Sequence, residues 1–203
     1  MKPSSRGVTL IELAVVLAVV AILMSQAGPL FSAWMQNVQI RTATESIQNG
    51  LQLARSEAIR RNRSVMFWLT STASPPAGDW LVGCSNPPGP ASVPEAPGDC
   101  PGSHTTGGVP ANGPPIYWIQ RQAATDQQTA LPQLTITPAG ANNVTFSSLG
   151  VVIPNIDGSA SITQIDVKSP AGTARPLRMT VSGGDIRMCD PALSLASDPR
   201  GCQ

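Results

Sequence analysis

Hydrophobic and polar positions divide the first third of the chain into two helical patterns. From Val8 to Phe31 the chain carries one charged residue, Glu12. As a helix this stretch is about 36 Å long at about 1.5 Å per residue, enough to cross a bilayer core. Apolar residues then recur at helical spacing as Trp34, Val38, Ile47, Leu51, Ala54 and Ala58. The pattern predicts one helix with a transmembrane half over 8–31 and an amphipathic half over 32–63, kinked at Pro29.

Strand patterns follow Asn62 and continue to the end of the chain. Short runs of alternating or β-branched residues lie at 64–70, 79–84, 116–122, 134–137, 143–153, 161–167 and 177–189. Ser182-Gly183-Gly184-Asp185 predicts a hairpin turn inside the last run. The Pro/Gly-rich stretch 85–115 lacks periodicity and predicts a surface loop. We expect an α+β fold, in which the long helix packs on an antiparallel sheet and 64–203 forms a β-rich head.

Charge is distributed unevenly along the chain. The net charge of +1 is the sum of +4 over residues 1–63 (seven Lys/Arg, three Asp/Glu) and −3 over 64–203 (six and nine). An acidic head does not favour general nucleic-acid binding, which requires a basic field around phosphates. Lys2 and Arg6 precede the apolar segment, so the positive-inside bias keeps the amino terminus cytoplasmic and exports the head.

All four cysteines lie in the exported part. Cys84, Cys100, Cys189 and Cys202 include no C-x-x-C pair, and the chain has one histidine, His104. Disulfides in an oxidising compartment are therefore favoured over a metal site. Three pairings are open, of which Cys84–Cys100 with Cys189–Cys202 closes the shortest loops. We expect no cofactor or metal and no catalytic residues, because no nucleophile–base pair, phosphate loop or metal-ligand cluster is visible.

A secretory signal peptide is the alternative interpretation of the amino terminus. Ser25-Gln26-Ala27 loosely fits a small-x-small cleavage site, and an exported enzyme would carry such a signal. Glu12 argues against it, because an acid within an apolar core is costly. The helical pattern also continues well past Ala27.

The stretch Gly7-Val8-Thr9-Leu10-Ile11-Glu12 resembles the prepilin leader motif of the type IV pilin and type II secretion pseudopilin superfamily. The resemblance implies that residues 1–7 are a leader, which prepilin peptidase removes between Gly7 and Val8 before Val8 is N-methylated. The family most often has Phe where this chain has Val8. The resemblance further implies that Glu12 meets the Val8 ammonium of a neighbouring subunit during filament assembly. This contact gives a buried acid its partner.

Three further stretches resemble the GspH/FimT branch of minor pilins and pseudopilins: QLARSEAIRRNRSV (52–65), VTFSSLG (144–150) and IRMCDPALSLASDPRGC (186–202). The resemblance implies a non-catalytic structural subunit that helps to initiate or cap a filament. Its partners would be other minor and major pilins or pseudopilins and the inner-membrane assembly platform. It would be a single-pass inner-membrane protein with a periplasmic head. A type IV pilus and a type II secretion system both stay open.

DNA binding during natural transformation is the alternative function within this branch. Some FimT-like proteins carry an Arg-x-Arg pair on the last hairpin, where this chain has Asp185 followed by Ile186 and Arg187. One arginine is lost and an acid is gained. A small DNA-binding patch would then consist of Lys168, Arg175, Arg178 and Arg187.

Overall fold

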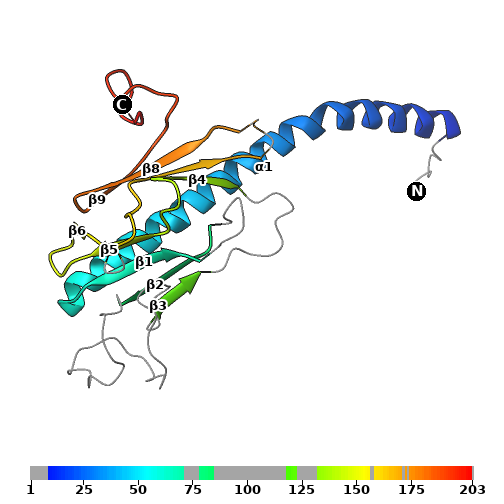
Figure 1. Ribbon diagram of the computed structural model, residues 1–203. Coiled ribbons are helices and arrows are strands. Elements are labelled where there is room, and N and C mark those ends of the chain that lie inside the picture. Colours follow the sequence, from blue (N-terminus) through cyan, green and yellow to red (C-terminus); the bar gives the residue numbers. More distant parts are fainter. Residues whose placement is uncertain are drawn as a thin grey trace, which may run out of the picture.

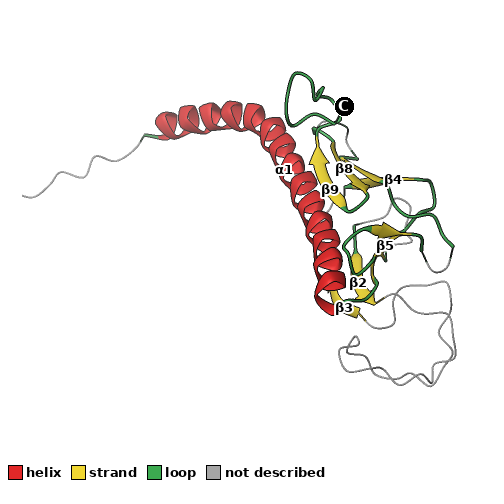
Figure 2. Cartoon of the chain, turned by 90° about the vertical axis from the view of Figure 1, so that its left-hand side faces the viewer, coloured by secondary structure: helices red, strands yellow, loops and turns green. Residues whose placement is uncertain are grey.

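The structure is a computed structural model, which describes residues 9–70, 78–84, 118–122, 132–155, 158–170, 172 and 174–202, with backbone only at 25–30 and 118. The helix α1, Leu10–Arg61, is 52 residues long. Its first part stands clear of the strands, and its second part lies along them (Figures 1 and 2). In the part of the chain that the structure describes, no helix is apolar enough over a sufficient length to count as a membrane span.

The helix is unbroken through Gly28 and Pro29, and Figure 2 shows that it bends along its length. The side chains of 25–30 lie outside the description, so Pro29 as the cause of the bend stays a prediction. The helix ends at Asn62, whose left-handed backbone (φ 52°) directs its N–H to the carbonyls of Ala58 and Ile59. Asparagine tolerates this conformation, which satisfies carbonyl groups at the helix end.

The strands form two sheets rather than the one we predicted. The first has the order β3-β2-β1-β5-β6 and the second the order β4-β7-β8-β9, and each strand pairs antiparallel with its neighbours. The strands are β1 Val65–Leu69, β2 Trp80–Cys84, β3 Trp118–Gln122, β4 Gln133–Thr137, β5 Asn143–Phe146, β6 Val152–Ile153, β7 Gln164–Lys168, β8 Leu177–Ser182 and β9 Asp185–Cys189. Both sheets pack on the same helix, so α1 is the common support of the head.

Two turns bear on the strand predictions. The run 143–153 is two strands, because the turn Ser147–Gly150, with Gly150 at φ +73°, reverses the chain between β5 and β6. The hairpin predicted at 182–185 is confirmed. Ser182 pairs with Asp185, and Gly183 and Gly184 take positive φ values of 60° and 116° between them.

One face of α1 builds the core. Ile40, Ile47, Leu51, Ala54 and Ala58 are buried against strands of both sheets. Trp34 and Val38, which we predicted on this face, are instead 59% and 41% exposed. Val38 and Ile47 are nine residues apart, about two and a half turns at about 3.6 residues per turn, so they lie on opposite sides of the helix. Ile40 and Thr44 take the buried positions.

A buried polar cluster connects the two sheets along the chain. Asn143 and Thr145 of β5 are fully buried beside Asn155. The Asn155 amide donates to the Asn143 side-chain oxygen and to the Ser159 carbonyl, and its own oxygen accepts from the Thr145 hydroxyl at 2.9 Å. The Ile162 N–H donates to the Asn143 carbonyl at 2.9 Å. Because each of these buried polar groups has a hydrogen-bond partner, burying the cluster between β5 and β7 costs little free energy.

The approach of α1 to the first sheet depends on Gly50. A Cβ at Gly50 would lie 2.8 Å from ring atoms of both Phe67 and Trp80. These rings are 6.0 Å apart between centroids and are buried. The indole N–H of Trp80 donates to the Ser46 hydroxyl at 3.0 Å, which fixes the ring against the helix.

We expect Gly50→Ala to destabilise the head although alanine is the better helix former. The propensity gain is about 1 kcal/mol, whereas an added methyl in a filled core costs about 1–3 kcal/mol. The urea midpoint of the purified chain should fall. Asn49→Ala is the matched control, because Asn49 is exposed on the same turn and its replacement should raise the midpoint slightly. A rise for both variants would contradict the close packing.

Candidate functional site

The amino-terminal end of α1 places Glu12 in a capping box. The Glu12 N–H donates to the Thr9 hydroxyl at 3.3 Å, and the Thr9 N–H donates to the Glu12 carboxylate at 3.3 Å. An acid in the first turn also suits the positive end of the helix dipole. Gly7 and Val8 lie outside the described residues, so cleavage and methylation there stay predictions. Thr9 is a site residue that we did not predict, although Thr-x-x-Glu before an apolar run is a capping signature.

The stretch 52–65 forms contacts at the far end of the helix. Glu57 accepts hydrogen bonds from Arg60 at 2.6 Å and from Arg61 at 2.7 Å. The hydrogen bond from Arg60 is the main reason that the pKa of Glu57 lies below its usual value, and Arg61 adds to it against the opposing effect of burial. Arg60 and Arg61, in the last turn of α1, are therefore paired with an acid about one turn earlier.

Arg55 joins the helix to the turn between β5 and β6. Its Nε donates to the Gly150 carbonyl at 3.1 Å. Arg55 belongs to the first GspH/FimT-like stretch and Gly150 to the second, so two sequence signatures far apart in the chain meet in space. A Cβ at Gly150 would lie 2.8 Å from Ile59 Cδ1. The glycine thus allows both its positive φ and the close approach of the helix.

The β8–β9 hairpin closes on the same turn. A Cβ at Gly184 would overlap the Gly150 carbonyl oxygen and lie 3.3 Å from Val151 Cα. Helix, first sheet and second sheet therefore converge on the Gly150 carbonyl, which we call the Gly150 junction (Arg55, Gly150 and Gly184). It fixes the two sheets relative to each other at the end of the head far from Thr9.

The four residues of the predicted DNA patch do not form one free basic surface. Arg178 donates to both oxygens of Asp166, at 2.7 and 3.1 Å, and its side chain is 21% exposed. This pairing raises the pKa of Arg178. Arg187 donates to the carbonyls of Pro199 and Gly201 at 3.3 Å each. Lys168, at the end of β7, is exposed. DNA binding through this patch stays a prediction, and all three of its arginines already have partners within the protein.

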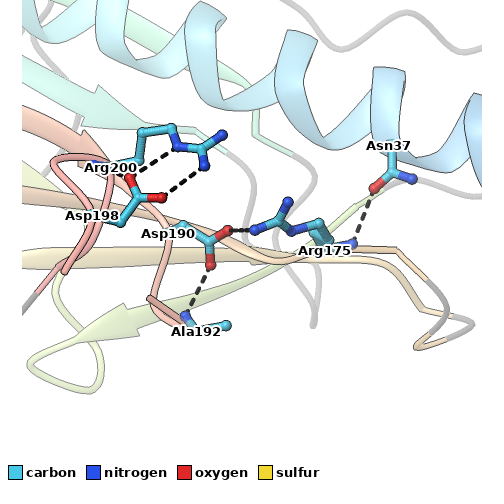
Figure 3. Close-up of polar contacts among 6 residues, drawn as sticks. All are labelled: Asn37, Arg175, Asp190, Ala192, Asp198 and Arg200. Atoms are coloured by element: carbon cyan, nitrogen blue, oxygen red, sulfur yellow. Dashed lines mark hydrogen bonds and ion pairs between the residues drawn. The ribbon is translucent and has the colours of Figure 1, made fainter. Parts of the chain in front are cut away.

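Arg175, the fourth member, lines a groove between α1 and the carboxyl-terminal tail (Figure 3). The groove has a volume of about 430 Å³ and is lined by Asn37, Arg41, Arg175, Leu177, Met188, Cys189, Asp190, Pro199 and Arg200. Each of its arginines is paired, Arg41 with Glu45, Arg175 with Asp190 and Arg200 with Asp198. Hydrogen bonds from Arg200 lower the pKa of Asp198 to about 2. The charges at the groove are thus balanced by ion pairs, and Leu177, Met188, Cys189 and Pro199 give it an apolar part.

A disulfide between Cys189 and Cys202 closes the tail beside this groove, which confirms one of the two predicted pairs. The Asp190 N–H donates to the Arg200 carbonyl at 2.7 Å, so the tail returns to the end of β9. Cys84 is also disulfide-bonded. Its predicted partner, Cys100, lies outside the described residues, and that pairing stays a prediction.

Comparison with known proteins identifies the family. A family model described as "Type II transport protein GspH" matches residues 43–185, which is more than half of the chain. The chain belongs to the GspH family. A second family model, the prokaryotic N-terminal methylation motif, matches residues 2–25. No curated protein matches the chain.

The fold is similar to that of the type IV minor pilin FimU of Pseudomonas aeruginosa. One crystal form of FimU gives a TM-score of 0.51 at 15% identity and covers 79% of this chain and 95% of that one. A second crystal form gives 0.44 at 15% identity, with 75% and 94% covered. The first likeness agrees with the predicted pilin-like α+β fold, with a long helix packed on antiparallel strands.

The GspH match runs from the middle of α1 to the β8–β9 hairpin. It therefore contains all three residues of the Gly150 junction. The disulfide-closed tail after Cys189 lies beyond the match. Within the GspH-matched region of this chain, the signatures at 52–65 and 144–150 have a structural role, because they hold helix and sheets together.

We expect Gly184→Ala to lower stability more than Gly183→Ala. Both glycines have positive φ, so either alanine costs about 1–2 kcal/mol in backbone strain. Only Gly184 lies against the Gly150 carbonyl, whereas a Cβ at Gly183 meets nothing within 4 Å. In Gly184→Ala, pushing the β8–β9 hairpin away from the Ser147–Gly150 turn should cost about 1–3 kcal/mol more. Unfolding midpoints measure both, and equal losses would show that the junction contributes no stability.

Proposed function

We propose that this chain is a minor pilin or pseudopilin, a non-catalytic subunit that helps to initiate or cap a filament rooted in the inner membrane. One observation carries the proposal. The first part of α1 stands clear of the head and exposes large apolar side chains from Leu10 to Met24. A helix that is apolar around its circumference needs an apolar surrounding. A membrane before assembly and neighbouring subunits afterwards supply that surrounding.

The methylation motif at residues 2–25 supports the expected processing. Prepilin peptidase would cut between Gly7 and Val8 on the cytoplasmic side, and Val8 would become the methylated amino terminus. The basic leader with Lys2 and Arg6 favours this topology. The head would then lie in the periplasm, where Cys189 and Cys202 can stay oxidised. Partners are other minor and major pilins or pseudopilins and the inner-membrane assembly platform.

Glu12 would serve assembly in two successive states. In the single chain its carboxylate caps the helix through Thr9. In the filament it would accept the Val8 ammonium of a neighbour, which lies at the start of an adjacent parallel helix. The capping box lowers the cost of the acid before the neighbour arrives, because the carboxylate already accepts two hydrogen bonds.

Between the two apparatuses, the disulfide-closed tail favours a type IV pilus, because it resembles the carboxyl end of FimT-like minor pilins. Deleting the gene in its host tests the proposal as a whole. Loss of surface pili with normal protein secretion supports a pilus subunit. Loss of secretion with normal pili supports a pseudopilin. Normal pili and normal secretion in the deletion strain would contradict both.

Gly7→Val should leave the leader attached, because a bulky side chain obstructs the peptidase at the cut. Intact mass spectrometry of the purified membrane form measures the outcome, since removing residues 1–7 and methylating Val8 changes the mass in a defined way. Gly7→Ala is the matched control and should still be processed, because its side chain is small. A mature mass for Gly7→Val would contradict the prediction, because it would show that cleavage does not require a small residue at position 7.

Glu12→Ala and Glu12→Gln separate the two roles of this residue. Glutamine can still occupy the capping box, but it has no charge for the Val8 ammonium. If the charge pair recruits the subunit, both variants should insert into the membrane and both should be missing from sheared filaments. Immunoblots of membrane and filament fractions measure this. Incorporation of Glu12→Gln at the wild-type level would show that capping alone is needed.

A further inference from the structure

An apolar stripe lies on α1 just after its first, freestanding part. Phe31, Trp34, Met35 and Val38 follow each other at helical spacing, and the first two are 62% and 59% exposed. The rings of Phe31 and Trp34 are adjacent, with centroids 5.8 Å apart. We call these four residues the aromatic stripe.

The aromatic stripe faces away from the head. Phe31, Met35 and Val38 each precede a head-facing residue, Ile40, Thr44 and Ile47, by nine residues, and all three of those are buried. Nine residues are about two and a half helical turns, so the two sets lie on opposite sides of α1. Neither sheet of this chain can therefore cover the stripe.

The stripe also marks a boundary along the helix. Before it the described residues from Leu13 to Met24 are uncharged, whereas the polar Gln36 and Asn37 lie within the stripe and are followed after it by Gln39 and Arg41. From Leu10 to Trp34 the helix rises about 36 Å at about 1.5 Å per residue. A bilayer is about 30 Å thick across its hydrocarbon core and about 40–45 Å with its headgroups. Trp34 therefore falls at the far headgroup level when the start of α1 lies near the cytoplasmic side.

The head meets the helix at this same level. The Ser169 hydroxyl donates to the Gln36 side chain at 2.7 Å, and the Arg175 N–H donates to Asn37 at 3.0 Å (Figure 3). Lys168, exposed beside Ser169, and the exposed guanidinium of Arg175 thus lie at the end of the head nearest the stripe. Anionic lipid headgroups attract basic residues close to the surface. Lys168 can meet them directly, and Arg175, although paired with Asp190, keeps 63% of its side chain exposed.

We propose that the aromatic stripe is a membrane-interface anchor that seats the unassembled subunit at the periplasmic headgroup layer, with Lys168 and Arg175 turned toward that layer. Trp is enriched at such interfaces because its ring is amphipathic. A neighbouring helix is the less suitable occupant, because helix contacts in membranes favour small residues that let backbones approach. All four stripe side chains are large. The inference rests on the membrane anchoring proposed above and adds what fixes the depth of the helix.

The experiment uses the full chain, one copy per nanodisc of phosphatidylethanolamine and phosphatidylglycerol. The fluorescence of Trp34 is obtained by subtracting the emission spectrum of the Trp34→Phe variant from that of the wild type. Lipids brominated near the headgroup and lipids brominated near the chain ends are compared as quenchers. We expect a blue-shifted Trp34 emission that shallow bromines quench more than deep ones. As a matched control, Leu149→Trp in the Trp34→Phe background puts the probe at an 82% exposed site in the distal turn, where neither lipid should quench it.

The outcomes separate this inference from the proposed function. If the chain does not float with nanodiscs at all, membrane anchoring itself is wrong. If it floats but Trp34 is as unquenched as the Leu149→Trp probe, the anchor is overturned and the membrane segment stands. Strongest quenching by deep bromines would place Trp34 inside the core and also overturn it. A blue-shifted Trp34 emission that appears only at two copies per nanodisc would also overturn the anchor, because a second helix would then cover the stripe.

The charged residues have their own readout in the same system. Lys168→Gln with Arg175→Gln should reduce shallow quenching of Trp34 in nanodiscs that contain phosphatidylglycerol. In nanodiscs of neutral phosphatidylcholine the same variant should behave as the wild type, because no anionic headgroup is present. Unchanged quenching in both lipids would remove these residues from the proposal. Salt-sensitive binding of duplex DNA by the wild type, lost in this variant, would assign them to nucleic acid instead.

Discussion

Burial of one face of α1 by both sheets is the contact on which the head depends. Ile47, Leu51, Ala54 and Ala58 form that face, and each is fully buried. A large aliphatic side chain buried in this way contributes about 1.5–3 kcal/mol. The small residues matter equally, because Gly50 lets Phe67 and Trp80 approach the helix backbone. The same helix continues out of the head as the exposed apolar segment, so the core and the proposed anchor share one continuous helix.

Helix, strands and hairpin could be predicted from local pattern, because each depends on spacing within a few residues. The division into two sheets could not, since sheet order depends on contacts between strands far apart in the chain. The run 143–153 shows the limit. Its β-branched residues predict one strand, whereas the turn that divides it needs Gly150 to meet Arg55 and Gly184. The prediction that Trp34 and Val38 lie on the buried face is wrong, because Val38 lies about two and a half helical turns before the buried Ile47 and so on the opposite side of the helix.

The contacts of the candidate site were also predictable only where they are local in sequence. The Cys189–Cys202 disulfide joins neighbouring cysteines of the chain, and the capping role of Thr9 follows from its spacing to Glu12. The partners of the basic residues could not be predicted from the sequence. Arg178 meets Asp166 only because β7 and β8 pair in the register that places these residues opposite each other. Arg187 reaches carbonyls of the tail. Arginines that look free in a sequence are here held by acids and carbonyls from other elements.

The arrangement of two sheets on one helix determines how the molecule transmits mechanical load. The sheets are hydrogen-bonded into separate ladders, and in the described residues the path from β5 to β7 runs through the Asn143–Asn155 cluster. Each sheet contacts α1 directly. A pull on the helix therefore reaches both sheets in parallel. Neither sheet has to carry the whole load of the other, and the contacts between the sheets, at the Asn143–Asn155 cluster and the Gly150 junction, hold their relative position.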